Sequence, residues 1–349
     1  MINDIVIVGG GTAGWLTAGI LAAEYRSQGV PSRQITLVES PDVSTIGVGE
    51  GTWPTMRTTL RRIGLSETDF LSTCSASFKQ GSKFVGWKDG SPQDAYYHPF
   101  SVPVGFADTN VYEAWQQFYA ARAFDETVNI QSRVCEKTVA PKQISTPEFA
   151  GALNYGYHLD AGKFSDLLMR HCTEKLGVKH IRDHVASIHS GEEGYISALQ
   201  TAQNGNISGQ LFIDCTGTHS LLIGQHYQVP FVDCRRYSVN DRALAVQVPY
   251  AQADSPIASA TIATAQSAGW TWDIGLSSRR GVGYVYSSDH IETDAAENEL
   301  MDYLRLSVDE KTLAGLSVRP LTIRPGYREK FWHKNCVAIG MSAGFIEPL

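Results

Sequence analysis

The chain has 349 residues, 43% of them hydrophobic, and a net charge of −7 at neutral pH. A chain of this length can bury a large core and is long for one domain, so we expect a cofactor domain with a second layer. An acidic chain without a basic run is a poor match for nucleic acid or an anionic membrane, which leaves small molecules as the expected partners. No apolar stretch is long enough to cross a bilayer, and the first strand begins too close to Met1 for a signal peptide. The six cysteines are widely spaced, so we expect a cytoplasmic protein with reduced thiols.

The first 24 residues have the pattern of a dinucleotide-binding turn. Residues 4–8 (DIVIV) form a β-branched run, residues 9–14 read GGGTAG, and residues 15–24 are typical of a helix. Gly9 permits a tight turn, Gly11 lets the backbone approach a pyrophosphate, and Gly14 lets the helix lie close to the sheet. We therefore expect phosphates at the helix N-terminus, where free N–H groups and the helix dipole favour negative charge.

An acidic residue ends the second predicted strand. Residues 35–38 (ITLV) are strand-like and are followed by Glu39, which is placed to accept hydrogen bonds from a ribose hydroxyl pair. An acid at this point disfavours a 2′-phosphate, so NADP does not suit the site. A strand before the glycines, a helix after them and an acid after the next strand together predict a dinucleotide site.

Two further features are compatible with a flavin. Residues 46–52 (IGVGEGT) form a glycine-dense loop that enters a helix at Pro54, and such a loop can bring bare backbone against a flavin ring. An ordinary connection with turn glycines explains the loop equally well. Trp270 and Trp272 lie in a strand-like run, so their rings should share one side and form one flat aromatic wall. The alternative is a pair of core aromatics.

With these motifs in view, the chain resembles the flavin-dependent tryptophan halogenases over essentially its whole length. The segments that carry the resemblance are residues 9–15 (GGGTAGW), 47–50 (GVGE), 78–79 (FK), 214–217 (DCTG), 269–274 (GWTWDI) and 345–349 (FIEPL). The Trp-x-Trp-x-Ile motif is the specific one, because it separates the halogenases from related flavin monooxygenases. The resemblance implies an α/β fold, with a Rossmann-like FAD-binding domain and a second, mostly antiparallel sheet over the flavin.

The same resemblance implies that the chain is one interwoven flavoprotein module. It places FAD-binding segments at about 1–95, 155–225 and 315–349, and a substrate and sheet layer at about 96–154 and 226–314. It also implies a set of cofactor-binding residues: Gly9, Gly11, Thr12, Ala13, Gly14, Glu39, Gly47, Val48, Gly49 and Val185.

The activity implied by the resemblance is halogenation of an electron-rich aromatic ring, an indole or tryptophan, with chloride or bromide. Reduced FAD from a separate flavin reductase, O2 and a halide give hypohalous acid, which travels through a tunnel to Lys79. Lys79 would polarise the acid as a hydrogen-bond donor or form a haloamine, and desolvation would favour its amine form. Trp270 and Trp272 would separate flavin from substrate, whereas His98 and Phe100 would hold the substrate ring. Lys83 has no counterpart in the motif and is expected to be structural.

Some details of the chain depart from the family pattern. Gly275 stands where the motif ordinarily has proline, so we expect a looser end of that strand. The family's catalytic glutamate and its halide-binding backbone would begin one residue beyond Leu349, so Glu347 is not assigned that role and a C-terminal part is expected to be missing. The resemblance leaves a homodimer open. His180 and His184 lack the Glu of a His-Glu-x-x-His site, so we predict no metal.

Two rival functions are also compatible with the sequence. A flavin monooxygenase of the same fold would hydroxylate the aromatic substrate directly, which needs flavin and substrate in contact. A non-catalytic flavin-binding protein is the second rival, because of Gly275 and the expected missing tail.

Overall fold

The computed structural model describes residues 2–29, 33–43, 49–91 and 93–346 of the chain. Its first large sheet has six strands, and four successive pairings in it are parallel, while the short edge strand β20 is antiparallel. In sheet order the strands are β20 (Trp332–His333), β21 (Cys336–Ala338), β12 (Leu211–Asp214), β1 (Asp4–Val8), β2 (Gln34–Glu39) and β8 (Lys179–Arg182).

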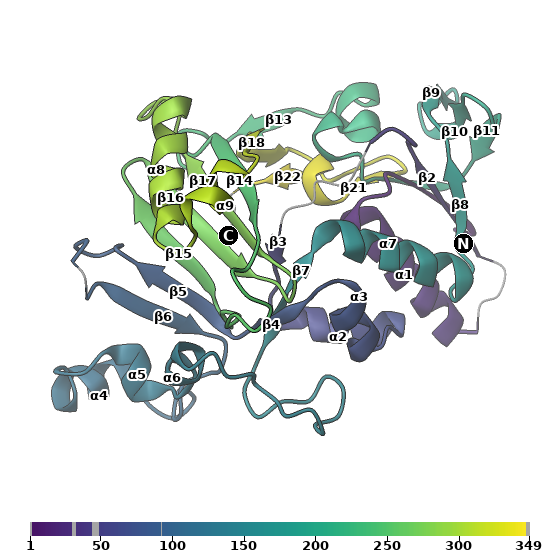
Figure 1. The fold of residues 1–349 in the computed structure, drawn as a ribbon. Coiled ribbons are helices and arrows are strands. Elements are labelled where there is room, and N and C mark those ends of the chain that lie inside the picture. The colour runs from purple at the N-terminus through teal and green to yellow at the C-terminus, as the bar shows by residue number, and fades with distance from the viewer. Residues whose placement is uncertain (1, 30–32, 44–48, 92, 347–349) are drawn as a thin grey trace.

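This sheet is covered on both faces, as its apolar strands require. Alternate residues of β1 enter two cores: Ile5 and Ile7 face one, whereas Val6 and Val8 face the other. The first core is closed by the helices α1 (Thr12–Ser27), α2 (Thr55–Ile63), α3 (Glu67–Thr73) and α7 (Ala161–Glu174), seen together in Figure 1. The second is closed by the short helical turn η2 (Leu221–His226) and by a sheet of β9 (Val185–Ser190), β10 (Ile196–Thr201) and β11 (Asn206–Ser208). The short turn η3 (Gly340–Ser342) contacts both η2 and η1 (Gly217–His219).

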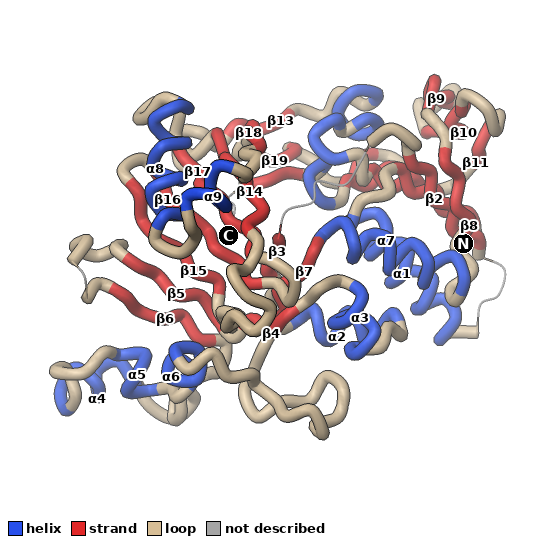
Figure 2. The backbone as a smooth tube through the Cα atoms, viewed as in Figure 1, coloured by secondary structure: helices blue, strands red, loops and turns tan. Residues whose placement is uncertain are grey.

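The second large sheet has seven strands and is antiparallel except where β15 pairs with β5. Its strands, in order, are β18 (Arg319–Thr322), β14 (Arg242–Val248), β17 (Arg280–Tyr286), β16 (Gly269–Gly275), β15 (Thr261–Gln266), β5 (Gly81–Val85) and β6 (Ala95–Pro99). The helices α8 (Thr293–Arg305) and α9 (Glu310–Ala314) lie against it (Figure 2). Their Leu300, Leu304 and Leu313 belong to the core that they share with the sheet. The sheet thus takes β5 and β18 from segments that the resemblance grouped with FAD binding.

A small sheet lies between the two large ones and positions the candidate site. It consists of β3 (Gly49–Gly51), β7 (Gly156–Asp160) and β4 (Ser77–Lys79), with β7 in the centre (Figure 1). Strand β3 contacts β16 and β17 of the seven-stranded sheet, whereas β7 runs directly into α7. The Asp160 side chain caps that helix by accepting a hydrogen bond from the Lys163 N–H.

The remaining elements lie at the edges of these layers. Three helices follow β6, namely α4 (Val111–Phe118), α5 (Phe124–Val128) and α6 (Gln131–Glu136), and a last sheet contains β13 (Phe231–Asp233), β19 (Gly326–Arg328) and β22 (Gly344–Phe345). None of the helices in the described ranges combines the length and apolarity that a membrane span needs. The predicted fold class, α/β with a second, mostly antiparallel sheet, is confirmed.

Candidate active site

The glycine turn after β1 contains two kinds of glycine. Gly9 has φ +113°, and a Cβ there would lie 2.2 Å from the Cys215 carbonyl oxygen. A Cβ on Gly14 would lie 1.9 Å from the Gly9 carbonyl oxygen. By contrast, a Cβ on Gly11 would have nothing within 4 Å. Gly9 and Gly14 are therefore required by the fold, whereas no atom in the described part of the chain accounts for the missing side chain of Gly11.

The N-terminus of α1 is prepared for an anion. Its N-cap is Gly11, which offers no capping side chain, and its first turn contains Thr12 and Ala13 without an acidic residue. Free N–H groups at such an end bind phosphates. Gly340 of η3 lies against this turn, since its Cβ would come within 2.9 Å of the Ala13 Cβ. The open space at Gly11 and the uncapped helix end fit a dinucleotide pyrophosphate.

Glu39 ends β2 beside the glycine turn. Its Oε1 lies 2.8 Å from His180 Nε2, and its Oε2 fills the place where a Cβ on Gly10 would be. The carboxylate borders a cavity of about 400 Å³ together with Gly10 and Trp15. Glu39 therefore lies within reach of a ligand that passes the turn, as the ribose assignment requires.

Other predicted cofactor residues lie farther along the chain. Val185 begins β9 and is half-buried against the second core. Gly47 and Val48 lie outside the described residues, as does Glu347. His184 bonds Asp42 at 2.9 Å, not His180, and among the described residues no three His, Cys, Asp or Glu side chains are grouped to hold a metal.

Trp270 and Trp272 share one side of β16, but they do not form a flat wall. Their ring centroids are 6.4 Å apart with ring planes at 67°, so the contact is edge-to-face. Trp270 is 8% exposed and belongs to a core cluster with Val285. The Trp272 indole lies across Gly283 of the neighbouring strand, where a Cβ would come within 2.1 Å of the ring. The prediction of one flat surface is therefore wrong, because each ring packs against a different neighbour.

Gly275 does not loosen the end of β16. It stays paired with Arg280 of β17, and its carbonyl accepts a hydrogen bond from the Ser77 Oγ at 2.5 Å. A Cβ at this position would lie 3.1 to 3.2 Å from atoms of Ile257 and Tyr250. The expected looseness is wrong because neighbouring chain segments close tightly on the strand end and leave little room for a side chain.

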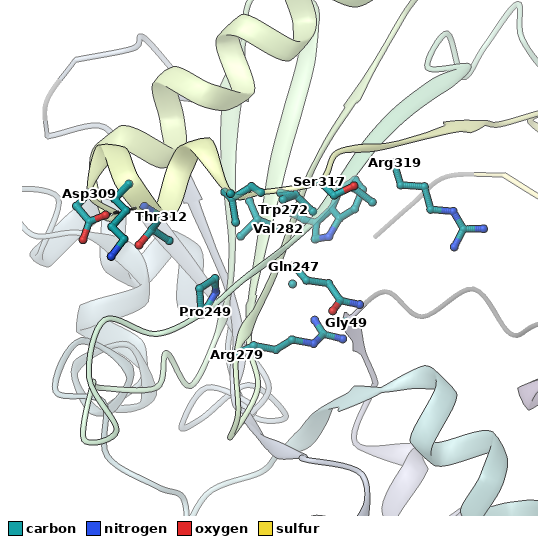
Figure 3. Close-up of a pocket in the computed structure, with 16 residues that line it drawn as sticks. Gly49, Gln247, Pro249, Trp272, Arg279, Val282, Asp309, Thr312, Ser317 and Arg319 are labelled. Atoms are coloured by element: carbon teal, nitrogen blue, oxygen red, sulfur yellow. Dashed lines mark hydrogen bonds between the residues drawn. The ribbon is translucent and has the colours of Figure 1, made fainter.

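A cavity of about 760 Å³ lies beside Trp272 on the seven-stranded sheet (Figure 3). Gly49 at the start of β3 borders it, and so does Arg279, whose Nη2 lies 2.7 Å from Asp160 Oδ2. Gly49 and Gly281 are in backbone contact, since a Cβ on Gly281 would lie 2.9 Å from the Gly49 Cα. Only glycine therefore fits at position 281 of this crossing.

The other end of β3 lies beside Lys79. A Cβ on Gly51 would come within 2.9 Å of Lys79 Nζ. Lys79 is 6% exposed, and among the described residues its Nζ forms neither a hydrogen bond nor an ion pair. Burial lowers the pKa of Lys79 to about 8. Lys83, by contrast, lies 2.5 Å from Glu136 in a salt bridge, as expected of a structural lysine.

An aromatic cluster lies on one side of the Lys79 ammonium, which it meets through the Phe100 ring. Its Nζ lies 5.7 Å from the centroid of the Phe100 ring. The Trp53 ring lies 5.4 Å from Phe100 and 6.3 Å from His98, so the structure brings the predicted Lys79, Phe100 and His98 together. Trp53 was missed by the sequence analysis, although it directly follows the glycine-dense loop before Pro54.

A buried histidine was also missed. His158 of β7 is fully buried, and its Nε2 lies 2.9 Å from Thr261 Oγ1. Burial, and then the Lys79 charge, lower the pKa of His158 well below its usual range, so its imidazole is neutral. The signal that could have found it is the place of His158 next to Tyr157 just before a helix: in a strand, such as β7, neighbouring side chains point to opposite faces.

Comparison with known proteins decides the family. Residues 4–349 match the family model described as tryptophan halogenase. The chain belongs to the tryptophan halogenase family. Over 99% of its length it is 33% identical to the tryptophan 6-halogenase of Streptomyces toxytricini, and over 100% it is 33% identical to the tryptophan 7-halogenase of Lentzea aerocolonigenes. The crystal structure of a tryptophan halogenase from Shewanella frigidimarina matches all of this chain with a TM-score of 0.95 and 55% identity.

The resemblance to tryptophan halogenases is thereby confirmed, and these relatives are enzymes. The chain spans 68% of the length of the Streptomyces enzyme, 66% of the Lentzea enzyme and 67% of the Shewanella chain. The match therefore covers the whole of this chain and about two thirds of each of these relatives.

Proposed function

We propose that this protein halogenates an electron-rich aromatic ring, an indole or tryptophan, with chloride or bromide, using FADH2 and O2. A separate flavin reductase supplies the FADH2. The observation that carries the proposal is Lys79, a buried lysine with no ion pair among the described residues, which lies beside the Phe100 ring. A structural lysine at such depth would be paired, because an isolated buried charge is costly.

The residues present fit FAD. Gly11, Thr12 and Ala13 would hold its pyrophosphate at the start of α1, and Glu39 would accept hydrogen bonds from its ribose. Gly49, with Gly47 and Val48 just before it, would lie against the flavin ring, and Val185 would hold the adenine through its backbone. When bound, reduced FAD supplies two electrons that, with two from the halide, reduce O2 to water and hypohalous acid.

The chain's own residues would deliver the hypohalous acid and exclude direct oxygen transfer. Strand β3 joins the cavity beside Trp272 to Lys79: Gly49 borders the cavity at one end, and Gly51 packs against Lys79 at the other. With a pKa of about 8, Lys79 is mostly an ammonium at neutral pH, so it would donate a hydrogen bond to hypohalous acid. The aromatic ring then replaces one hydrogen by halogen and water is released. Trp272 would stand between flavin and substrate.

The test is product mass spectrometry with the full-length protein, FAD, a flavin reductase, NADH, bromide and either tryptophan, indole or phenol. We expect a brominated product with its isotope doublet. Lys79→Ala should lower product formation by at least about a hundred- to a thousandfold while FAD binding and consumption of reduced FAD persist. Lys83→Ala, which removes a salt-bridged lysine, is the matched control and should retain activity. A plain oxygen addition would identify a monooxygenase, and bound FAD without any product would identify a flavin-binding protein.

A further inference from the structure

Trp53 lies at the edge of the Lys79 site on a firmly held backbone. The Thr52 N–H donates to the Tyr157 carbonyl at 2.8 Å, and the Tyr157 N–H donates to Thr52 Oγ1 at 2.9 Å. On its other side, the Trp53 carbonyl accepts a hydrogen bond from the Met56 N–H as α2 begins. The backbone position of Trp53 is therefore set by β7 and α2.

The Trp53 side chain is exposed, and its indole N–H is not used within the described part of the chain. It is 52% exposed, and within the described part of the chain its Nε1–H has no hydrogen-bond partner. Three other tryptophans donate this hydrogen to a carbonyl: Trp87 to Ala263, Trp115 to Arg122 and Trp332 to Lys334. An exposed aromatic ring that packs beside a functional site, with its polar group unused, is typical of a ligand-binding residue.

Trp53, Phe100 and His98, the three rings of this cluster, form a corner and not a slot. Trp53 and Phe100 are 5.4 Å apart with ring planes at 38°, and Trp53 meets His98 edge-on at 67°. Stacked ring centroids are at least about 4.5 Å apart, so a ring inserted between two others needs about twice that distance. A ligand ring therefore has no room between Trp53 and Phe100. It can only lie against the surface that they form together.

The charge at this corner selects the kind of ring. The Lys79 ammonium lies 5.7 Å from the Phe100 centroid, close to where a ligand on the corner would sit. A cation attracts the negative face of an electron-rich ring. Phenols and indoles meet this requirement better than electron-poor rings.

We propose that Trp53 is a substrate-binding residue that forms the third wall of this corner and limits the size of the flat, electron-rich ring that reaches Lys79. The reaction at Lys79 rests on the proposed function, whereas binding at Trp53 does not. A ring that lies against Phe100 is bounded on one side by Trp53, whose ring centroid is 5.4 Å from that of Phe100. A three-ring compound such as carbazole is longer than indole, so on Phe100 we expect it to meet the Trp53 ring.

The test is calorimetric binding of indole to the full-length, FAD-loaded protein. We expect the dissociation constant to rise about five- to tenfold in Trp53→Ala and Trp53→Leu, as expected for the loss of one ring contact, and less than about twofold in Trp53→Phe. Trp332→Ala is the matched control, since Trp332 is also exposed but lies on β20, and it should bind like wild type. Melting curves of each variant check that the fold is retained.

A competition assay then tests the size limit. With indole and carbazole at equal concentrations, Trp53→Ala should raise the ratio of halogenated carbazole to halogenated indole. An unchanged or lower dissociation constant for indole in both Trp53→Ala and Trp53→Leu would overturn the proposal, and so would loss of FAD from the variants. Indole binding that depends on Trp53 in a wild-type protein that makes no halogenated product would instead refute the proposed function and leave this inference standing.

Discussion

Tyr157 and His158 are neighbours on β7 and point to opposite faces of the small sheet, and each faces a buried charge. On the Tyr157 face lies Glu67, which is 1% exposed. Its carboxylate accepts hydrogen bonds from Tyr157 and Tyr155 at 2.6 and 2.7 Å, from Lys142 at 2.7 Å and from the Phe149 N–H at 2.7 Å. Burial opposes ionisation of Glu67, but these hydrogen bonds outweigh it and lower its pKa.

On the His158 face, the Lys79 charge has no ion-pair partner among the described residues. Lys79 is 6% exposed, its neighbours are Gly51, the neutral His158 and the Phe100 ring, and only burial shifts its pKa. The two faces teach a distinction between groups that the fold itself satisfies and groups that only a ligand would satisfy. The first kind stabilises the protein, whereas the second lowers its stability and is therefore a candidate for a functional role.

The glycine turn shows the same distinction and gives the largest expected effect. Gly11→Val should fold normally, because its side chain would meet no protein atom within 4 Å at the Cβ, yet it should exclude the pyrophosphate. We expect FAD binding to weaken by more than about a thousandfold, equivalent to about 4 kcal/mol. Flavin absorbance of the purified protein and titration with FAD measure this.

Gly14→Val is the matched control for that experiment. Its Cβ would clash with the Gly9 carbonyl at 1.9 Å, so this variant should lose the fold together with FAD. If Gly11→Val retained FAD with an unchanged flavin spectrum, the assignment of the turn would be refuted.

Much of the first sheet could be predicted because its signals are local. The run at residues 4–8 became β1, residues 15–24 lie in α1, and residues 35–38 lie in β2. Each of these elements is read from consecutive residues with a single periodicity. The roles of Gly9 and Gly14 in the fold were predicted for the same reason.

The geometry of the site could not be predicted, because it depends on contacts between distant residues. Trp270 and Trp272 alternate as a strand requires, but their tilt is set by Val285 and Gly283 on the neighbouring strand. The fit at Gly275 depends on Ile257 and Tyr250, which no local pattern connects to it. Trp53 likewise joins Phe100 only because β7 fixes the backbone before α2.

The second prediction concerns Glu67, the buried charge that hydrogen bonds and an ion pair satisfy. Glu67→Gln should lower the free energy of unfolding by about 3–4 kcal/mol, since it leaves the buried Lys142 ammonium without its counter-charge. The pKa of Glu67 is lowered in the folded protein, so its contribution is present above its ordinary value and is lost as the pH falls through the folded value. Urea unfolding of wild type and variant at neutral and acidic pH checks this. A variant as stable as wild type at neutral pH would show that the cluster is not structural.

The last prediction concerns the Lys79 ammonium. Removing it should change the free energy of unfolding in the opposite direction. Lys79→Met keeps the length of the side chain without its ammonium, so it should raise the free energy of unfolding at neutral pH. The pKa of Lys79 is about 8 in the folded protein and 10.5 ordinarily, so the unfolded state binds more protons between these values and wild-type stability increases with pH there. This difference sets an upper limit of about 3 kcal/mol for the gain.

The gain in the free energy of unfolding of Lys79→Met should be full below a pH of about 8. It should disappear above the ordinary lysine pKa of 10.5, where Lys79 is neutral in both the folded and the unfolded wild type. Urea unfolding of wild type and Lys79→Met from neutral to alkaline pH measures it, and Lys83→Met is the control, since its salt bridge to Glu136 should make that variant slightly less stable. A loss of stability in Lys79→Met at neutral pH would mean that the fold, and not a ligand, uses the ammonium. A stabilised but inactive variant would show that the protein retains Lys79 for its chemistry at the expense of its fold.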